Sequence, residues 1–460
     1  MTSPSSRPLF SVVIPTRERA ETLRSTLQTC LAQDFDDYEI VVCDNHSSPA
    51  TREVVDQADS PRIRYLRTDR PLAMSANWEY ALSETRGDYL TVVGDDDGLM
   101  PYALRELAIL IERYSRPSAV TWRRGIYTWP TMAVPEDANY LHIPLGRTLR
   151  EISGKEAIAD VIAFRTGADL LPMIYSAVVR RDLVEDLRER VGRVFPTIYP
   201  DVYSGFALAW LSGTYLSSGV PMGIAGLGGQ SNGVATLRVS GDNAIADEFA
   251  SLNAEFDIVA HPRVPDLRLG PVHVVDSFEW ARQCVFPETD LDYDRRSMVC
   301  RYLESMTELD PAVRKQQREV IRATLQDDAE LLSWFDREAP DPPPRVLPRL
   351  KPAVLGPTPN TLAIDAAELG LLDIAGATRV SAAILGVGAG PIVYSTPPAR
   401  PAGQSAQAAA AQEMTDLRRR NQRLRQRCKE LEAQLAAKQD LRSAVRGVVR
   451  RIRRRVTSRR

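Results

Sequence analysis

Between residues 10 and 93, short apolar runs typical of strands alternate with segments in which apolar residues recur at helical spacing. Short apolar runs rich in β-branched residues predict strands at 10–15, 38–43, 63–66 and 89–93. Between these runs, apolar residues recur every three or four positions, which predicts helices at 21–33, 51–58 and 75–85. This alternation indicates an α/β fold with a mostly parallel sheet, helices on both faces and right-handed crossovers.

Polar residues follow three of the predicted strands: Thr16-Arg17, Asp44-Asn45 and Asp95-Asp96-Asp97. Parallel sheets bind ligands beyond the carboxyl ends of their strands, so we expect these segments to meet at one edge. Three adjacent carboxylates repel unless they are solvated, hydrogen-bonded or neutralised by a cation. Oxygen ligands suit Mg²⁺ or Mn²⁺ carrying a diphosphate, and the alternative is a solvated acidic turn.

An uncharged stretch extends from Val202 to Leu237. Its length is sufficient for a membrane span, but Pro221 and eight glycines interrupt it. We therefore predict a buried helix followed by a flexible glycine-rich loop, rather than a transmembrane helix.

The remaining pattern divides the chain into five parts. Residues 1–240 form the α/β domain, and residues 241–338 form a helical extension. Residues 339–412 are a proline- and alanine-rich linker that contains a small apolar segment of unassigned structure. Residues 413–441 carry a heptad pattern, and residues 442–460 form a basic amphipathic tail.

The heptad pattern predicts a homo-oligomer through residues 414–440. Apolar residues dominate the a and d positions, which are Met414, Asn421, Cys428 and Leu435, and Leu417, Leu424, Leu431 and Lys438. About three heptads are regular, so a solitary amphipathic helix is the alternative.

The tail at 442–460 contains nine arginines and no acidic residue. Since the whole chain carries a formal charge of −2, residues 1–441 carry about −11. Valines and Ile452 recur at helical spacing among the arginines, which favours an anionic membrane surface as the partner. Nucleic acid is the less favoured partner, and disorder is the other alternative.

The chain contains five cysteines, which are scattered and show no CxxC spacing, and this pattern fits a reducing compartment. The N-terminal residues lack an apolar signal core. Together with the basic tail, these features predict a cytoplasmic protein that is peripheral at the inner face of the plasma membrane.

Two segments resemble the nucleotide-sugar domain of family 2 glycosyltransferases. They are SVVIPTRERAETLRSTLQTCLAQDFDDYEIVVCDNHSS at 11–48 and PLAMSANWEYALSETRGDYLTVVGDDDGLMPYAL at 71–104. The resemblance is close over residues 9–115 and loose over 116–240. It implies a Rossmann-like GT-A fold, an inverting reaction, a nucleotide-diphosphate sugar donor and a divalent metal, Mn²⁺ or Mg²⁺.

The resemblance also implies roles for residues near the donor. The nucleotide pocket would be lined by Pro15, Thr16, Arg17 and Glu18. Asp44 would accept a hydrogen bond from the base, or alternatively cap a turn. Asn77 would make a polar contact near the donor, or alternatively lie on a helix surface.

For the metal, counting back from Pro101 makes Asp96 the ligand and Asp95 the ribose contact. A second alignment, Asp95-x-Asp97, makes Asp97 the ligand, and we favour Asp96. The general base implied by the family is Asp201, although Pro200 replaces the usual preceding Glu. A helix N-cap is the alternative role for Asp201.

Two further features have open roles. Trp122, Tyr127 and Trp129 would either stack on sugar rings or belong to the core. The stretch Gly219–Gly233 could form a lid over the donor and acceptor.

The sequence thus favours an inverting glycosyltransferase that moves a sugar to a saccharide or lipid-linked acceptor in cell-surface polysaccharide or glycoconjugate synthesis. A sugar-phosphate nucleotidyltransferase would need a Gly-x-Gly-x-Arg loop, and Pro15-Thr16-Arg17-Glu18-Arg19 has none. A non-catalytic scaffold that recruits partners through its coiled coil is the other alternative.

Overall fold

The computed structural model describes residues 7–132, 134–229, 244–265, 267, 269–309, 311–341, 350–352, 355–358, 360–387 and 392–395. The chain forms two compact units. The first contains residues 1–354 and 363–397, and the second contains residues 355–362 and 398–460. The predicted coiled coil at 413–441 and basic tail at 442–460 lie outside the described residues.

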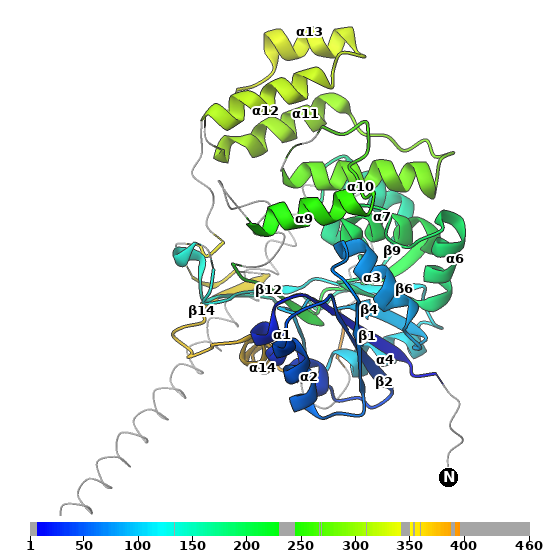
Figure 1. Ribbon diagram of the computed structural model, residues 1–460, viewed down its shortest axis with the longest axis vertical. Helices are drawn as coiled ribbons and strands as arrows, with labels where there is room; N and C mark the ends of the chain where they lie inside the picture. The colour runs from blue at the N-terminus through cyan, green and yellow to red at the C-terminus, as the bar shows by residue number, and fades with distance from the viewer. Residues whose placement is uncertain are drawn as a thin grey trace, which may run out of the picture. The chain divides into compact units, whose positions relative to one another are not determined.

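An eight-stranded sheet with the order β3-β2-β1-β4-β10-β6-β11-β9 forms the centre of the first unit (Figure 1). Its first four strands are parallel: β3 (Ile63–Arg67), β2 (Tyr38–Asp44), β1 (Phe10–Thr16) and β4 (Tyr89–Val92). The sheet continues with β10 (Ala177–Arg180), β6 (Ala119–Trp122), β11 (Thr214–Ser218) and β9 (Leu149–Ser153). Because β10 runs antiparallel to both its neighbours, the sheet is mixed but mostly parallel.

The predicted alternation of strands and helices is confirmed. The connecting helices are α1 (Ala20–Leu31), α2 (Pro49–Ala58) and α3 (Met74–Ser83), and α4 (Ala103–Arg113) follows the aspartates. The predicted apolar face of α1 is buried, including Leu23, Leu27 and Cys30. The strands β1, β2 and β4 are buried along their whole length, as expected for a parallel sheet covered on both faces.

A second sheet adjoins the aspartates. In the first unit it includes β8 (Tyr140–Pro144), β7 (Gly125–Thr128), β12 (Gly223–Leu227) and β5 (Gly98–Leu99), in that order. The prediction of a flexible loop in the glycine-rich stretch is wrong for Gly223–Leu227, because this segment is strand β12. Backbone hydrogen bonding to β7 and β5 holds it, and its glycines permit a close approach to the aspartates.

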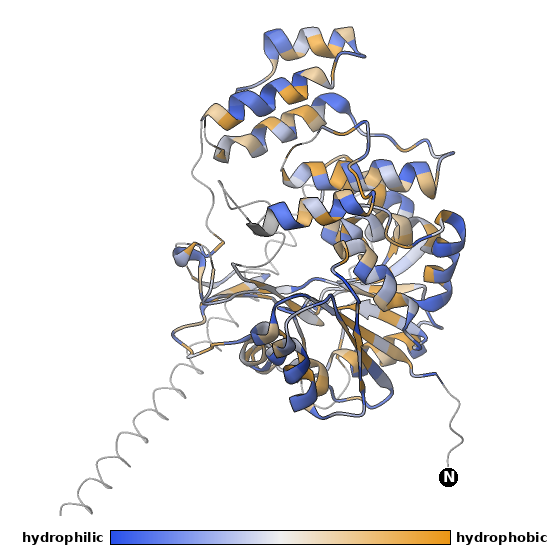
Figure 2. Cartoon of the chain, in the orientation of Figure 1, coloured by the Kyte–Doolittle hydropathy of each residue, from blue (hydrophilic) through white to orange (hydrophobic). Residues whose placement is uncertain are grey.

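One face of the large sheet is covered by helices that share a single hydrophobic core. These are α3, α5 (Gly154–Ile162), α6 (Arg181–Val191), α7 (Pro200–Ser212) and α10 (Gly270–Cys284). Figure 2 shows strongly apolar strands in the sheet, whereas α12 carries many hydrophilic residues. The predicted buried helix after Val202 corresponds to α7, which packs against α10 and α5.

The predicted helical extension is also present. It consists of α9 (Ala244–Glu255), α10, α11 (Arg295–Ser305), η3 (Met306–Glu308), α12 (Pro311–Ala323) and α13 (Ala329–Glu338). A second core joins its later helices through residues such as Tyr302, Ile321 and Phe335. Short 3₁₀ turns occur at Pro135–Asp137 and Ala168–Leu170.

The apolar segment whose structure the sequence left unassigned contains one strand and one helix, β14 (Thr361–Asp365) and α14 (Ile374–Leu385). Within the first unit, α14 packs against α1, β5 and β12. The second unit includes β13 (Gly356–Pro357). Among the described residues, no helix combines the length and apolarity that crossing a bilayer requires.

Candidate active site

The predicted polar segments meet at the carboxyl edge of the parallel strands. Thr16 lies opposite Asp44 in the β1–β2 register, and β4 on the other side of β1 leads directly into the aspartates. The Thr16 hydroxyl donates to Asp95 Oδ2 at 2.7 Å. We call Asp95-Asp96-Asp97 the acidic segment. The prediction that the end of β1 and the acidic segment lie close together is therefore confirmed.

The first two aspartates converge on an arginine that the sequence analysis did not single out. Arg19 Nη1 lies 3.0 Å from Asp95 Oδ1 and 3.6 Å from Asp96 Oδ2. All three side chains are largely buried. The two carboxylates thus share one guanidinium, which offsets part of their mutual repulsion.

The third aspartate, Asp97, turns toward the second sheet. Its Oδ1 accepts the Gly226 backbone N–H at 2.8 Å, and its Oδ2 accepts that of Gly94 at 3.3 Å. Arg124 Nη1 lies 3.6 Å from Asp97 Oδ2. Burial raises the pKa of Asp97, while Arg124 and the two backbone donors oppose this rise. Both carboxylate oxygens of Asp97 are thus used within the protein.

Arg124 also connects the acidic segment with Asp201. Its guanidinium lies 3.7 Å from the centre of the Tyr175 ring, a cation–π contact. Asp201 lies in the first turn of α7, directly after Pro200, and Tyr199 rather than Asp201 is the N-cap. Burial raises the pKa of Asp201, whereas the Val202 N–H and Arg124 lower it.

The loop after β1 turns sharply at Glu18, whose φ of 53° lies in the left-handed region. Glu18 N donates to Ser47 Oγ at 2.9 Å. The turn separates two arginines, because Arg17 Nη1 donates to the Asn45 carbonyl at 2.8 Å while Arg19 faces the aspartates. Arg17 also forms an exposed ion pair with Glu248 of α9. Thr16, Arg17 and Glu18 therefore lie beside the end of β2, and Pro15 is buried within β1.

Asp44 is fully buried at the end of β2. Its Oδ1 accepts the Ser47 N–H at 2.8 Å, so Asp44 does cap a turn, which was the alternative role. Its Oδ2 accepts the Tyr65 hydroxyl at 2.5 Å and lies 3.4 Å from Arg67 Nη1. A nucleobase would have to share Asp44 with these groups.

Asn77 is buried on α3, so the alternative placement on a helix surface is wrong. Its Oδ1 accepts a hydrogen bond from the Cys43 thiol at 3.2 Å, and both residues are buried. Trp122, Tyr127 and Trp129 are also buried, which makes core packing their structural role. Trp129 has an additional contact, because its Nε1 donates to the Asp96 carbonyl at 3.2 Å and helps to fix the acidic segment.

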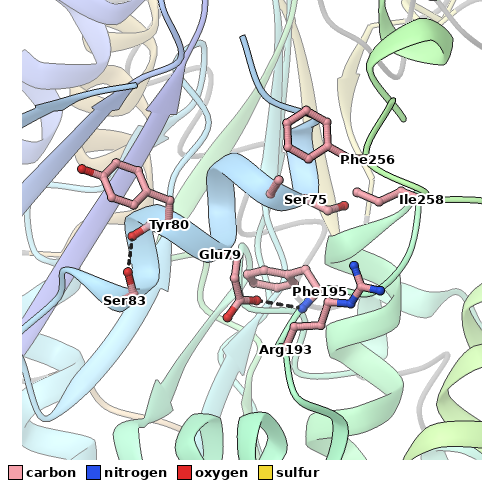
Figure 3. A pocket seen from close by; sticks show the side chains of 9 residues that line it. Ser75, Glu79, Tyr80, Ser83, Arg193, Phe195, Phe256 and Ile258 are labelled. Atoms are coloured by element: carbon pink, nitrogen blue, oxygen red, sulfur yellow. Dashed lines mark hydrogen bonds between the residues drawn. The ribbon is translucent and has the colours of Figure 1, made fainter. Parts of the chain in front are cut away.

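Figure 3 shows a pocket of about 310 Å³ along one face of α3. It is lined by Ser75, Ala76, Glu79, Tyr80, Ser83, Arg193, Phe195, Phe256 and Ile258. The Glu79 carboxylate is engaged by Arg188 and by the N–H groups of Val194 and Phe195. None of the predicted site residues lines this pocket.

In the part of the chain that the structure describes, no three His, Cys, Asp or Glu side chains converge as a ready-made metal site. Mg²⁺ is commonly held by one or two carboxylates, with substrate phosphates and water completing its coordination. Asp95 and Asp96, on adjacent positions, supply two such carboxylates, and both now lie near Arg19. Asp97 fits less well, because its oxygens accept two backbone N–H groups.

The sequence analysis missed four residues at this site: Arg19, Arg124, Tyr175 and Gly226. A signal existed for Arg19, since three adjacent carboxylates require nearby cations and Arg19 follows the predicted strand 10–15. Arg124, Tyr175 and Gly226 come from segments without a local motif, and only the tertiary fold brings them to the aspartates.

Fold and site together define an α/β protein with an acidic cluster at the carboxyl edge of its parallel strands. Residues 11–160 match the family model described as Glycosyl transferase family 2. These residues make up about a third of the chain, and over them the chain is similar to this family.

Two relatives resemble the same region. A GalNAc(5)-diNAcBac-PP-undecaprenol β-1,3-glucosyltransferase of Campylobacter jejuni is 36% identical over 103 residues, which is 22% of this chain and 33% of that protein. The colanic acid biosynthesis glycosyl transferase WcaA of Escherichia coli, itself a tentative assignment, is 28% identical over 101 residues, 22% of this chain and 36% of that protein. The match thus spans about a third of each relative.

Among solved structures, S. aureus TarS 1–349 in complex with UDP-GlcNAc aligns with a TM-score of 0.43 at 14% identity. The alignment covers 71% of this chain and 83% of that chain. The mannosyltransferase PcManGT from Pyrobaculum calidifontis, in complex with GDP-Man and Mn²⁺, aligns with a TM-score of 0.34 at 16% identity, covering 73% and 89%.

Proposed function

We propose that the chain is an inverting glycosyltransferase that uses a nucleotide-diphosphate sugar and a divalent cation. The observation that carries the proposal is the Thr16–Asp95 hydrogen bond, which joins the predicted nucleotide loop to the acidic segment. The similarity of residues 11–160 to this family supports the same reaction class.

The donor would bind across the ends of β1, β2 and β4. Thr16, Arg17 and Glu18 surround the turn after β1, and Asp44 lies beside them at the end of β2. Asp95 would contact the ribose, and its hydrogen bond with Thr16 supports this role. A nucleotide-binding edge of this kind is the usual ligand site of parallel sheets.

Asp96 would hold the divalent cation, and Asp97 would anchor the acidic segment to β12. This division follows from their contacts, because Asp97 uses both oxygens for Gly94 and Gly226. When bound, the cation would offset negative charge on the diphosphate leaving group.

Asp201 would remove the proton from the acceptor hydroxyl as that oxygen attacks the sugar. Burial raises the pKa of Asp201, and a raised pKa makes a carboxylate a stronger base. Arg124, which interacts with both Asp97 and Asp201, would keep Asp201 ionised beside the acidic segment.

The acceptor would be a saccharide or lipid-linked saccharide in cell-envelope polysaccharide or glycoconjugate synthesis. The names of the relatives from C. jejuni and E. coli support this class. Residues 442–460 would hold the chain at an anionic membrane surface, and residues 414–440 would self-associate. We infer a cytoplasmic enzyme that is peripheral at the inner face of the plasma membrane.

A thermal-shift panel tests donor use directly. The panel would contain UDP-, GDP- and dTDP-sugars, each with Mn²⁺ or with EDTA. A ligand at about 100 times its Kd adds about 2.7 kcal/mol of stability, so one nucleotide class should raise the Tm only with Mn²⁺. If no nucleotide sugar raises the Tm, the alternative of a non-catalytic scaffold gains support.

A further inference from the structure

Two arginines balance the three aspartates of the acidic segment, and they do so differently. Arg124 is stacked on Tyr175 and pairs with Asp97, which is also fixed by two backbone N–H groups. Arg19 instead reaches Asp95 and Asp96, the carboxylates that fit a metal. Arg124 therefore has a structural role at Asp97, whereas Arg19 lies at the two carboxylates proposed to face the ligand.

The position of Arg19 conflicts with a divalent cation on the same carboxylates. Arg19 Nη1 is 3.0 Å from Asp95 Oδ1 and 3.6 Å from Asp96 Oδ2, with the guanidinium only 17% exposed. A Mg²⁺ or Mn²⁺ ion bound to Asp96 would meet this positive charge at close range. Since like charges disfavour one another in a partly buried site, a cation on Asp96 and the present Arg19 contact disfavour each other.

Arg19 lies in the short loop between β1 and α1. Arg19 is the residue before α1 begins at Ala20, and it follows the left-handed turn at Glu18. The other arginine of this loop, Arg17, contacts the Asn45 carbonyl and Glu248 instead. Arg19 is thus the arginine of this loop whose guanidinium lies next to the place proposed for the donor diphosphate.

We propose that Arg19 acts as a built-in counter-ion that blocks the divalent cation until a nucleoside diphosphate arrives. In the absence of ligand, Arg19 neutralises Asp95 and Asp96. When metal and diphosphate bind together, Arg19 exchanges Asp96 for diphosphate oxygens, which a guanidinium binds well. Metal binding and nucleotide binding are therefore positively coupled through this one residue.

This inference rests on the proposed function, and Mn²⁺ binding tests it without any turnover. Electron paramagnetic resonance would measure free Mn²⁺ against the full chain, alone and with UDP, GDP or dTDP. In the wild type, one nucleoside diphosphate should tighten Mn²⁺ binding by about tenfold or more. In Arg19→Gln, Mn²⁺ should bind about tenfold more tightly without nucleotide, and the tightening by nucleotide should shrink to about threefold or less.

Two control variants separate charge from folding. Arg19→Lys keeps a positive charge, so its Mn²⁺ affinity without nucleotide should stay as weak as that of the wild type. Arg24→Gln removes an exposed arginine on α1 that contacts Gln57, and it should match the wild type in every measurement. Circular dichroism and the Tm of each variant establish that the fold is retained.

The inference is overturned if Arg19→Gln binds Mn²⁺ no more tightly than the wild type without nucleotide. It is equally overturned if Arg19→Lys gains the same affinity as Arg19→Gln. If a nucleoside diphosphate binds the wild type, as judged by the Tm, without tightening Mn²⁺ binding, the inference fails and the proposed function stands. If no nucleoside diphosphate binds at all, the proposed function fails. The nucleotide-free comparison still decides whether Arg19 competes with the metal.

Discussion

Gly226 N donates to Asp97 Oδ1 at 2.8 Å and joins strand β12 to the acidic segment, 129 residues earlier in the chain. A Cβ atom at Gly226 would lie 1.8 Å from the Asp96 carbonyl oxygen and 2.7 Å from Trp129 Nε1. A residue with a side chain at position 226 would therefore prevent the backbone of β12 from lying this close to the aspartates. This contact makes β12 part of the site, and it yields the first prediction.

Gly226→Ala should displace the acidic segment and remove Mn²⁺-dependent nucleotide binding. The methyl group must push backbone atoms apart, and overpacking of this kind costs about 1–3 kcal/mol of stability. Gly228→Ala is the matched control, since its Cβ would meet other atoms only at 3.7 Å or more. Nucleotide-dependent shifts in Tm compare the two variants. Equal behaviour of both would show that the β12 contact does not shape the site.

Asp201→Asn should lower turnover by roughly 10²–10⁴-fold and leave donor affinity near that of the wild type, because an amide cannot accept the acceptor proton. Asp182→Asn is a control from the first turn of another helix, α6, where Asp182 pairs with Arg180. Single-turnover kinetics and donor titration separate the two effects. A loss of donor affinity together with turnover would make Asp201 a donor ligand or a structural residue.

The proposed role of Asp201 also predicts how kcat/KM depends on pH on the acid side. A base must be ionised, so kcat/KM should fall as the pH drops through the pKa of Asp201. Since burial raises the pKa of Asp201, this fall should begin above the ordinary aspartate value of about 3.9. An acid limb that persists unchanged in Asp201→Asn would assign it to another group.

Asp276 offers a stability prediction away from the site. It is fully buried on α10, its Oδ1 accepts the His261 N–H at 2.6 Å, and burial raises its pKa to about 6. Since the unfolded value is about 3.9, the folded state binds the extra proton between these values. The contribution of Asp276 to stability therefore falls as the pH rises through this window and stays unfavourable above it.

Asp276→Asn should accordingly stabilise the protein at pH 8, by on the order of 2 kcal/mol, and have little effect at pH 4. Buried His273, whose pKa is lowered to about 4, gives the opposite pH dependence in both proteins and cancels in their difference. Tm measurements from pH 4 to 8 would show the trend, with exposed Asp247→Asn as the control. A constant difference at every pH would contradict the prediction.

Truncation after Ala411 should leave an active, smaller species, because the site residues all precede it. The full chain should sediment with anionic vesicles and dissociate at high salt, since the tail carries nine arginines. Equal binding to neutral vesicles would contradict the electrostatic account. An unchanged oligomeric state after truncation would contradict self-association through 414–440, and preferential binding to nucleic acid would favour that partner instead.

The local pattern of the sequence was sufficient for the parallel half of the fold. Strands β1, β2 and β4 are buried and mainly apolar, and β1 to β4 alternate with helices, so their order and their shared edge follow from short-range rules. The three segments at that edge were therefore predicted together. The division of roles among Asp95, Asp96 and Asp97 was not, because it depends on Arg19, Arg124 and Gly226.

The wrong prediction for Gly223–Leu227 and the burial of Asn77 both have tertiary causes. Gly223–Leu227 has the composition of a loop, but β7 and β5 supply its hydrogen bonds and Asp96 and Trp129 exclude any side chain at Gly226. Asn77 has a polar side chain on a helix, but a buried thiol from Cys43 supplies its partner. These partners are distant in the sequence, so the residues next to Gly223–Leu227 and Asn77 do not predict them.

The most direct test of the central claim measures nucleoside diphosphate release from the identified donor sugar by the wild type, with Mn²⁺ and with EDTA, and by Asp96→Ala and Asp97→Asn. The account predicts release by the wild type with Mn²⁺ and none with EDTA. Asp96→Ala should be inactive and should lose Mn²⁺-dependent nucleotide binding, because the diphosphate loses its bridging cation. Asp97→Asn should retain Mn²⁺ binding even where its stability is reduced. Full activity of Asp96→Ala, or full activity of the wild type in EDTA, would contradict the account.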